Sequence, residues 1–164
     1  MSATPTETSA TDRDLHLSRC IDAPREKVYR AWTEPELLRQ WFTPRPWTVT
    51  QVETDVRPGG ASLVVMCSPE GLEFPSRGVY LEVVPNRRLV FTDAYTYAWE
   101  PAAKPFMTVI LTFDEEIEGE GERTRYTALV RHWTTADREA HEKMGFHEGW
   151  AKATDQLAEL AASL

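Results

Sequence analysis

The sequence predicts an α+β fold: a seven-stranded curved antiparallel sheet, two short helices after the first strand, and a long C-terminal helix over the concave face. Apolar residues alternate over residues 15–21 and then recur at helical spacing up to residue 42. From Trp47 to Trp133 the period is that of strands, and from Thr135 to Leu164 helix formers return on one apolar stripe. A sheet closed by a helix accounts for this order.

Size and charge limit the class of protein. The chain has 164 residues, of which 41% are hydrophobic and 27% charged, and this suits one globular domain that folds without disulfides or metals. The formal net charge is -8 and no basic run occurs, so nucleic acid is not expected as a partner. No apolar stretch approaches the roughly 20 residues that span a bilayer, so no membrane span is predicted.

The start of the chain and its cysteines predict a cytoplasmic protein. Residues 1–14 lack the basic start and the apolar stretch of a secretory signal. Cys20 and Cys67 show no CxxC spacing and lie in apolar stretches, so both are expected to be buried thiols. Residues 1–13 are mostly small, polar or charged, which predicts a flexible tail before a single domain over residues 14–164.

Two short helices are predicted directly after the first strand. Asp22 supplies an N-cap acid, and Pro24 stands close to the first helical turn. The first helix ends before Pro35, which opens the second helix. The prolines within residues 43–46 then end the second helix.

Turn residues divide the stretch from Trp47 to Trp133 into six strands, which with the first strand make seven. The acidic last turn is expected to be a solvated hairpin tip rather than a metal site. The breaks fall at Pro58-Gly59-Gly60, at Glu70-Gly71, at Pro85-Asn86 and within residues 114–122.

One amphipathic helix is predicted over residues 135–164. Gly145 and Gly149 lie inside its pattern, where each costs about 1 kcal/mol relative to Ala, so close packing or a bend is expected there. The stripe that would face the sheet consists of Phe146, Trp150, Ala153, Leu157, Leu160 and Leu164.

A set of short motifs is spread along the chain in a specific order and spacing. They are Asp22-Ala23-Pro24, Val28, Ala31-Trp32-Thr33, Pro35, Leu38, Trp41, Arg57-Pro58-Gly59-Gly60, Gly78, Glu82-Val83-Val84-Pro85, Arg88-Leu89-Val90-Phe91-Thr92, Gly149-Trp150 and Leu157. In this order and spacing they resemble the activator of heat-shock-protein-90 ATPase homologue family, of the START-like (SRPBCC, helix-grip) superfamily. The resemblance runs from about residue 15 to residue 160 and implies a deep cavity between the sheet and the C-terminal helix. It implies no fixed cofactor and no single activity.

Ligand-binding residues for this cavity can be predicted from two patterns: the alternation of apolar residues along the late strands, and the apolar stripe of the C-terminal helix. One face of each strand and one side of the helices supply the apolar walls, while the polar anchors come from the ends of strands and the shoulder of the helix. The predicted walls are Trp41, Leu111, Phe113, Tyr126, Val130 and Trp150, and the predicted anchors are Asp93, His132 and His147.

Binding of an apolar or amphipathic small molecule, such as a lipid or a polyketide-like compound, is the leading functional hypothesis. An enzyme of the cyclase or hydrolase kind is the first alternative, with His132, His147, Asp93 or Tyr126 acting on a carbonyl compound. A chaperone-associated protein is the second alternative, because the family is named after an ATPase activator. A homodimer is also open, because exposed aromatics near Trp47 and Trp99 and at Trp133 would form an apolar patch.

No catalytic residue, metal ligand or cofactor site is predicted. The sequence contains no GxSxG elbow, Walker loop, GxGxxG fingerprint or HExxH helix. His141 and His147 are six residues apart, so on one continuous helix they would be separated by about 240° and would not share a metal.

Overall fold

The computed structural model of the protein describes residues 11–118 and 121–164. The tail expected over residues 1–13 therefore lies mostly outside the described residues. Its last three residues are described: the Asp12 carbonyl accepts a hydrogen bond from the Arg138 guanidinium at 3.0 Å, and the Arg13 carbonyl accepts one from the His132 backbone at 2.9 Å.

The first half of the fold follows the predicted order of a strand, two short helices and further strands. Its elements are β1 (Asp14–Ile21), α1 (Arg25–Thr33), α2 (Pro35–Trp41), β2 (Thr48–Thr54), β3 (Ala61–Cys67), β4 (Glu73–Val84) and β5 (Arg88–Thr92). The second half holds β6 (Tyr95–Tyr97), β7 (Glu100–Pro101), β8 (Met107–Glu118), β9 (Gly121–His132), α3 (Thr135–Lys143) and α4 (Phe146–Ser163).

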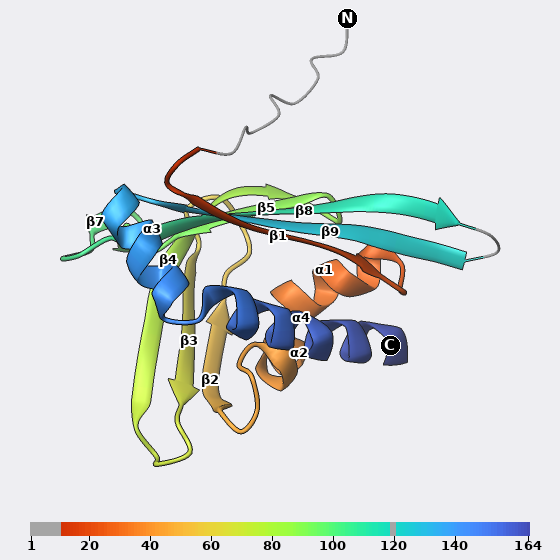
Figure 1. The fold of residues 1–164 in the computed structure, drawn as a ribbon, viewed down its shortest axis with the longest axis horizontal. Coiled ribbons are helices and arrows are strands. Elements are labelled where there is room, and N and C mark those ends of the chain that lie inside the picture. The colour runs from red at the N-terminus through yellow and green to blue at the C-terminus, as the bar shows by residue number, and fades with distance from the viewer. Residues whose placement is uncertain (1–10, 119–120) are drawn as a thin grey trace, which may run out of the picture.

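A seven-stranded antiparallel sheet forms the body of the molecule, in the order β1-β9-β8-β5-β4-β3-β2. Figure 1 shows that the sheet is strongly bent: β1, β9, β8 and β5 run along one direction, β4, β3 and β2 turn away from it, and α4 lies within the angle. The β4–β5 register shifts between Tyr80 and Glu82, which is the kind of bulge that bends a strand. Strands β6 and β7 form a separate two-stranded sheet.

Close strand packing at this bend requires a glycine at position 78. A Cβ built on Gly78 would lie 2.4 Å from the backbone oxygen of Thr92, at the end of the neighbouring strand β5. Backbone atoms cannot give way as a flexible side chain can, so any side chain here would push the two strands apart. Because position 78 is glycine, the backbones of β4 and β5 can approach each other closely at the bend of the sheet.

The β8–β9 hairpin is longer than the predicted turn allowed. Strand pairing continues without interruption to Glu118 and Gly121, so most of the acidic segment 114–122 is strand rather than turn. Across the hairpin, Asp114 pairs with Arg125 and Glu116 with Arg123, so acidic residues of β8 lie opposite basic residues of β9. Arg125 also donates a hydrogen bond to Glu116 at 3.2 Å. Most of the acidic run therefore lies on two paired strands.

The two short helices begin close to their predicted prolines. Helix α1 has Pro24 as its N-cap, with no side-chain capping bond. Asp22 does not cap it; its carboxylate lies 3.5 Å from the Arg123 guanidinium instead. Pro35 opens α2 as predicted, because the first turn of a helix needs no N–H from that position.

The C-terminal segment folds as two helices rather than the single predicted one. Helix α3 ends at a turn in which Gly145 has φ +98°, a left-handed conformation that glycine adopts without steric cost. Helix α4 begins directly after this turn and carries the predicted apolar stripe, with Phe146, Ala153 and Leu157 buried. The bend expected at the glycines is therefore a complete interruption at Gly145, while Gly149 stays within α4.

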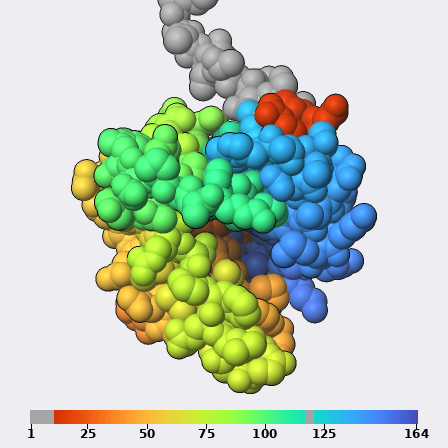
Figure 2. All heavy atoms as spheres, turned by 90° about the vertical axis from the view of Figure 1, so that its left-hand side faces the viewer, coloured from red at the N-terminus to blue at the C-terminus, as the bar shows by residue number. Residues whose placement is uncertain are grey.

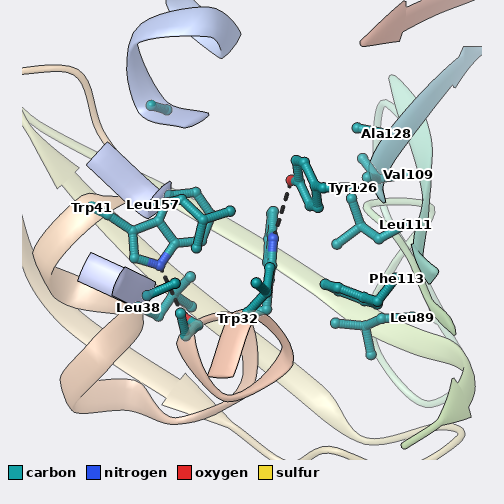
Figure 3. Packing of buried hydrophobic residues seen from close by; sticks show 14 of the residues in the cluster. Trp32, Leu38, Trp41, Leu89, Val109, Leu111, Phe113, Tyr126, Ala128 and Leu157 are labelled. Carbon is teal, nitrogen blue, oxygen red and sulfur yellow. Dashed lines mark hydrogen bonds between the residues drawn. The ribbon is translucent and has the colours of Figure 1, made fainter. Parts of the chain in front are cut away.

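A continuous hydrophobic core fills the angle between the sheet and the helices (Figure 3). Alternate residues of β8 and β9 point into it, as predicted from the strand period. Its completely buried members include Ile21, Val28, Leu89, Leu111, Phe113, Tyr126, Val130 and Leu157. Cys20 and Cys67 are half-buried free thiols rather than fully buried ones. No helix among the described residues is long and apolar enough to cross a membrane.

Candidate functional site

A cavity of about 390 Å³ opens between α2, the sheet and the turn that joins α3 to α4; we refer to it as the large cavity. Figure 2 looks onto its mouth, where the surface is hollowed between the green segment before β8, the yellow-green β3–β4 hairpin and the blue helices α3 and α4. Its lining is Trp32, Trp41, Phe42, Pro44, Met66, Ser76, Met107, Tyr126, His141, Met144, Gly145, Phe146, Gly149, Trp150, Ala153 and Thr154.

Three aromatic rings of α1, α2 and the residue after α2 form one wall of the large cavity. The Trp32 and Trp41 rings meet edge to face with centroids 4.8 Å apart, and Phe42 packs against both at 5.9 Å. The Trp41 indole N–H donates to the Ala31 carbonyl at 2.9 Å, which fixes the ring orientation. This wall presents apolar ring surface to the cavity.

Tyr126 contributes a buried polar group to the inner wall of the large cavity. Its oxygen accepts a hydrogen bond from the Trp32 indole nitrogen at 3.1 Å, drawn as a dashed line in Figure 3. The side chain is completely buried, and burial raises the pKa of the Tyr126 phenol above its usual range. The hydroxyl is therefore uncharged at neutral pH.

The turn between α3 and α4 forms the rim of the large cavity. Phe146 follows Gly145 and packs its ring against Trp150 at 5.3 Å and against His141 at 5.2 Å. Met144 is the most exposed member of this group, with 77% of its surface accessible. The left-handed glycine thus brings side chains from two helices around one opening.

A histidine pair joins this rim to the sheet. The Nε2 of His132 lies 2.8 Å from the Nδ1 of His141, and the Nδ1 of His132 lies 2.9 Å from the Arg13 carbonyl oxygen. Burial, together with the neighbouring His132, lowers the pKa of His141 to about 4. His141 is therefore a neutral imidazole at physiological pH, and it lines the large cavity.

A smaller cavity of about 50 Å³ adjoins the large one and shares Trp32, Phe42, Ser76 and Met107 with it. Asp93 lines this small cavity. Its carboxylate accepts hydrogen bonds from the backbone N–H groups of Phe106 and Met107 at 2.9 and 3.1 Å. Asp93 thus ties the segment before β8 to the end of β5.

Of the nine predicted ligand-binding residues, Trp41, Tyr126 and Trp150 line the large cavity and Asp93 lines the small one. Leu111, Phe113 and Val130 point to the predicted side of the sheet, but they are buried in the core and line neither cavity.

Helix α1 explains why part of the predicted wall is core. Tyr29 packs edge to face on Phe113 at 5.7 Å, so α1 covers that end of β8. The cavity lies toward the other end of the strand, where β8 begins at Met107.

The two predicted histidine anchors have different surroundings. His132 is 1% exposed and reaches the cavity only through His141. His147 faces away from the cavity, with a side chain 58% exposed, and its Nε2 lies 2.8 Å from the Glu142 carboxylate. This contact lowers the pKa of the Glu142 carboxyl.

Most lining residues of the large cavity were not predicted as ligand-binding residues, and His141 is the titratable one among them. On one continuous helix its direction follows from that of His147, and only the break at Gly145 frees it to turn toward the sheet. The glycine followed by an apolar residue was the available signal, because it is typical of a helix end. No group of three or more His, Cys, Asp or Glu residues with the geometry of a metal site occurs in the described part of the chain.

The fold and the cavity together define a helix-grip domain of the START-like class: a bent antiparallel sheet that grips a C-terminal helix, with an internal cavity between them. A model of the family described as activator of Hsp90 ATPase homolog 1-like protein matches residues 22–162. The chain belongs to this family.

Solved structures of other proteins share the fold. A protein from Nitrosomonas europaea is 41% identical, with a TM-score of 0.88 over 94% of this chain and 97% of that one. A protein from Chromobacterium violaceum is 27% identical, with a TM-score of 0.68 over 92% and 98% of the two chains. One from Rhodobacter sphaeroides, at 24% identity and a TM-score of 0.79 over 96% and 97%, shares the fold alone. No curated protein matches the sequence.

Proposed function

We propose that the protein binds an apolar or amphipathic small molecule in the large cavity and so sequesters or senses it. The observation that carries this proposal is the cavity itself, about 390 Å³ in volume and walled mainly by aromatic and aliphatic side chains. Small-molecule sites typically have about 300–1,000 Å³ and a few polar groups that fix orientation. Tyr126 and His141 are polar groups of that kind.

Binding can be measured with the purified protein by native mass spectrometry and by tryptophan fluorescence against a panel of lipids and aromatic polyketides. Trp32, Trp41 and Trp150 all line the large cavity, so an occupant is expected to change their emission. A wild-type protein that binds no member of the panel in either measurement contradicts the proposal.

A cavity-filling variant provides the control for where the ligand binds. Ala153 is buried on α4 and lines the large cavity, so Ala153→Phe is expected to occupy part of its volume and abolish binding. Ala162→Phe places the same ring on an exposed position of α4 and is expected to leave binding unchanged. Equal loss in both variants would show that binding does not depend on the large cavity.

The cyclase or hydrolase alternative requires its acid and base to reach one substrate. Asp93 and Tyr126 line different cavities, His132 is covered by His141, and His147 is exposed. These four side chains give the enzyme hypothesis no common site, and we retain binding as the proposal.

A further inference from the structure

We propose that the two polar ends of the large cavity have fixed and opposite hydrogen-bonding roles, and that its ligand is an elongated apolar molecule with a carbonyl-type acceptor at one end and a hydroxyl-type donor at the other. This inference rests on the proposed binding function and deepens it. The donor of the protein is the Tyr126 hydroxyl, and its acceptor is the Nε2 of His141.

The role of Tyr126 follows from the indole that bonds it. An indole N–H only donates, so the Tyr126 oxygen must accept from Trp32 at 3.1 Å. Its own O–H proton has no acceptor among the residues that the structure describes, although the side chain is completely buried and lines the large cavity. A buried donor without a partner is costly, and a ligand acceptor in the cavity satisfies it.

The role of His141 follows from a chain of hydrogen bonds that starts at a carbonyl. The Arg13 oxygen only accepts, so the Nδ1 of His132 carries a proton. In the His132 tautomer that carries its proton on Nδ1, Nε2 is an acceptor, and the Nδ1 of His141 donates to it across 2.8 Å. A neutral His141 protonated on Nδ1 has an unprotonated Nε2, which accepts from a ligand donor.

The other polar side chains of the large cavity do not fix an orientation. The Thr154 hydroxyl already donates to the Trp150 carbonyl at 2.6 Å. Ser76 lies where the two cavities meet, and a hydroxyl there can either donate or accept.

The donor and the acceptor lie toward opposite ends of the cavity. Tyr126 and His132 are on one face of β9, six residues apart, so their α-carbons are separated by about 20 Å at strand spacing. His141 lies beside His132 at the rim, and the aromatic wall of Trp32 and Trp41 covers the Tyr126 end. A ligand that satisfies both ends presents apolar surface between its two polar groups.

Three matched probes separate these roles: an alkylbenzene, the same molecule with a methyl ketone at the end of its chain, and that ketone with a para-hydroxyl on the ring. Chains of two, four and six methylene groups vary the spacing between the two polar groups of the probe. Affinities are measured by isothermal titration calorimetry.

Tyr126→Phe is expected to weaken the ketone and the hydroxyketone by about 3- to 10-fold, the range of one neutral hydrogen bond, and to leave the alkylbenzene unchanged. His141→Asn keeps an amide near the Nδ1 position for His132 but removes Nε2, so it should weaken the hydroxyketone alone. His141→Gln, which returns polar atoms near the Nε2 position, should recover part of that loss.

Tyr29→Phe and His147→Asn make similar changes at residues outside the large cavity and serve as controls. If Tyr126→Phe and His141→Asn leave all probes unchanged, weaken the alkylbenzene as much as the others, or show reversed selectivity, the assigned roles are wrong while the binding function stands. If the wild-type protein binds none of the probes, including the alkylbenzene, the binding function fails and the assigned roles fail with it.

Discussion

The indole nitrogen of Trp32 donates a hydrogen bond to the hydroxyl of Tyr126 over 3.1 Å, and this contact joins α1 to β9 inside the wall of the large cavity. The same contact therefore holds the fold together and orients a polar group toward the cavity. Its contribution to stability can be separated from its contribution to binding.

Tyr126→Phe is expected to lower the free energy of unfolding by about 1–2 kcal/mol, because the Trp32 N–H then lies in the core without an acceptor. Urea denaturation followed by circular dichroism measures this. Tyr29→Phe is the matched control, since no described residue bonds the Tyr29 hydroxyl, and it should change stability by less than about 0.5 kcal/mol. Equal effects of the two variants would contradict the role given to the bond.

Leu111 and Trp150 were both predicted as cavity walls, and mutation should now distinguish them. Leu111 is completely buried, so Leu111→Ala is expected to cost about 2–5 kcal/mol of stability and to leave ligand affinity nearly unchanged. Trp150 is half-buried and lines the large cavity, so Trp150→Ala should cost less stability and weaken binding more. Thermal unfolding and ligand titration of both variants provide the comparison, and the reverse order would refute the assignment.

Replacing the two glycines of the α3–α4 region with alanine should have opposite effects on the stability of the fold. Gly145 has φ +98°, so Gly145→Ala is expected to destabilise the fold by roughly 1–2 kcal/mol. Gly149 lies within α4 and a Cβ there meets nothing within 4 Å, so Gly149→Ala should stabilise by about 0.5–1 kcal/mol.

Because Gly149 also lines the large cavity, its added methyl group narrows the space for a ligand. Gly149→Ala should therefore raise the unfolding temperature and weaken binding at the same time. Calorimetric melting and titration of the same sample test both effects, and an unchanged affinity would show that a ligand does not approach α4 at this position.

Stability should fall in mild acid because of His141. Its pKa is lowered from 6.5 to about 4, so between these pH values the unfolded chain binds a proton that the folded chain does not. The free energy of unfolding therefore has its full value above pH 6.5 and decreases as the pH falls toward about 4. Solvent screening of this half-buried ring limits the loss to on the order of 1–2 kcal/mol.

Urea titrations across this pH range, compared between the wild-type protein and His141→Asn, isolate the contribution of that ring from those of the carboxyl groups. The difference in stability between the two proteins should shrink as the pH falls. His147→Asn is the control, because that histidine is exposed. A difference that stays constant with pH would contradict the lowered pKa.

The period of apolar residues was enough to predict the sheet and the two short helices. It identified the inward face of β8 and β9 because burial on one side of a strand imposes an alternation that a single sequence displays. It also identified the apolar stripe of α4, from Phe146 to Leu157.

The position of the cavity along that inward face was not predictable in the same way. Leu111 on β8 and Met107 at the start of the same strand are both apolar and share one face, yet only Met107 lines the large cavity. The packing of Tyr29 on Phe113 fills the other end of that face. The wrong assumption of one continuous helix also hid His141, because a single residue in a left-handed conformation changes the direction of everything before it. The position of the cavity therefore depends on tertiary contacts, and the direction of His141 depends on one backbone angle. Neither is visible in the pattern of apolar residues.

The carbonyl groups of Asp12 and Arg13 have a practical consequence for any shortened form of this protein. Both oxygens accept hydrogen bonds from residues far along the sequence, one from Arg138 on α3 and the other from His132 at the end of β9. A fragment cut at residue 14 would lose the acceptor that sets the protonated nitrogen of His132, and through it the proton position on His141. The boundary chosen for expression would then alter the chemistry of the cavity rim without changing any residue that lines it.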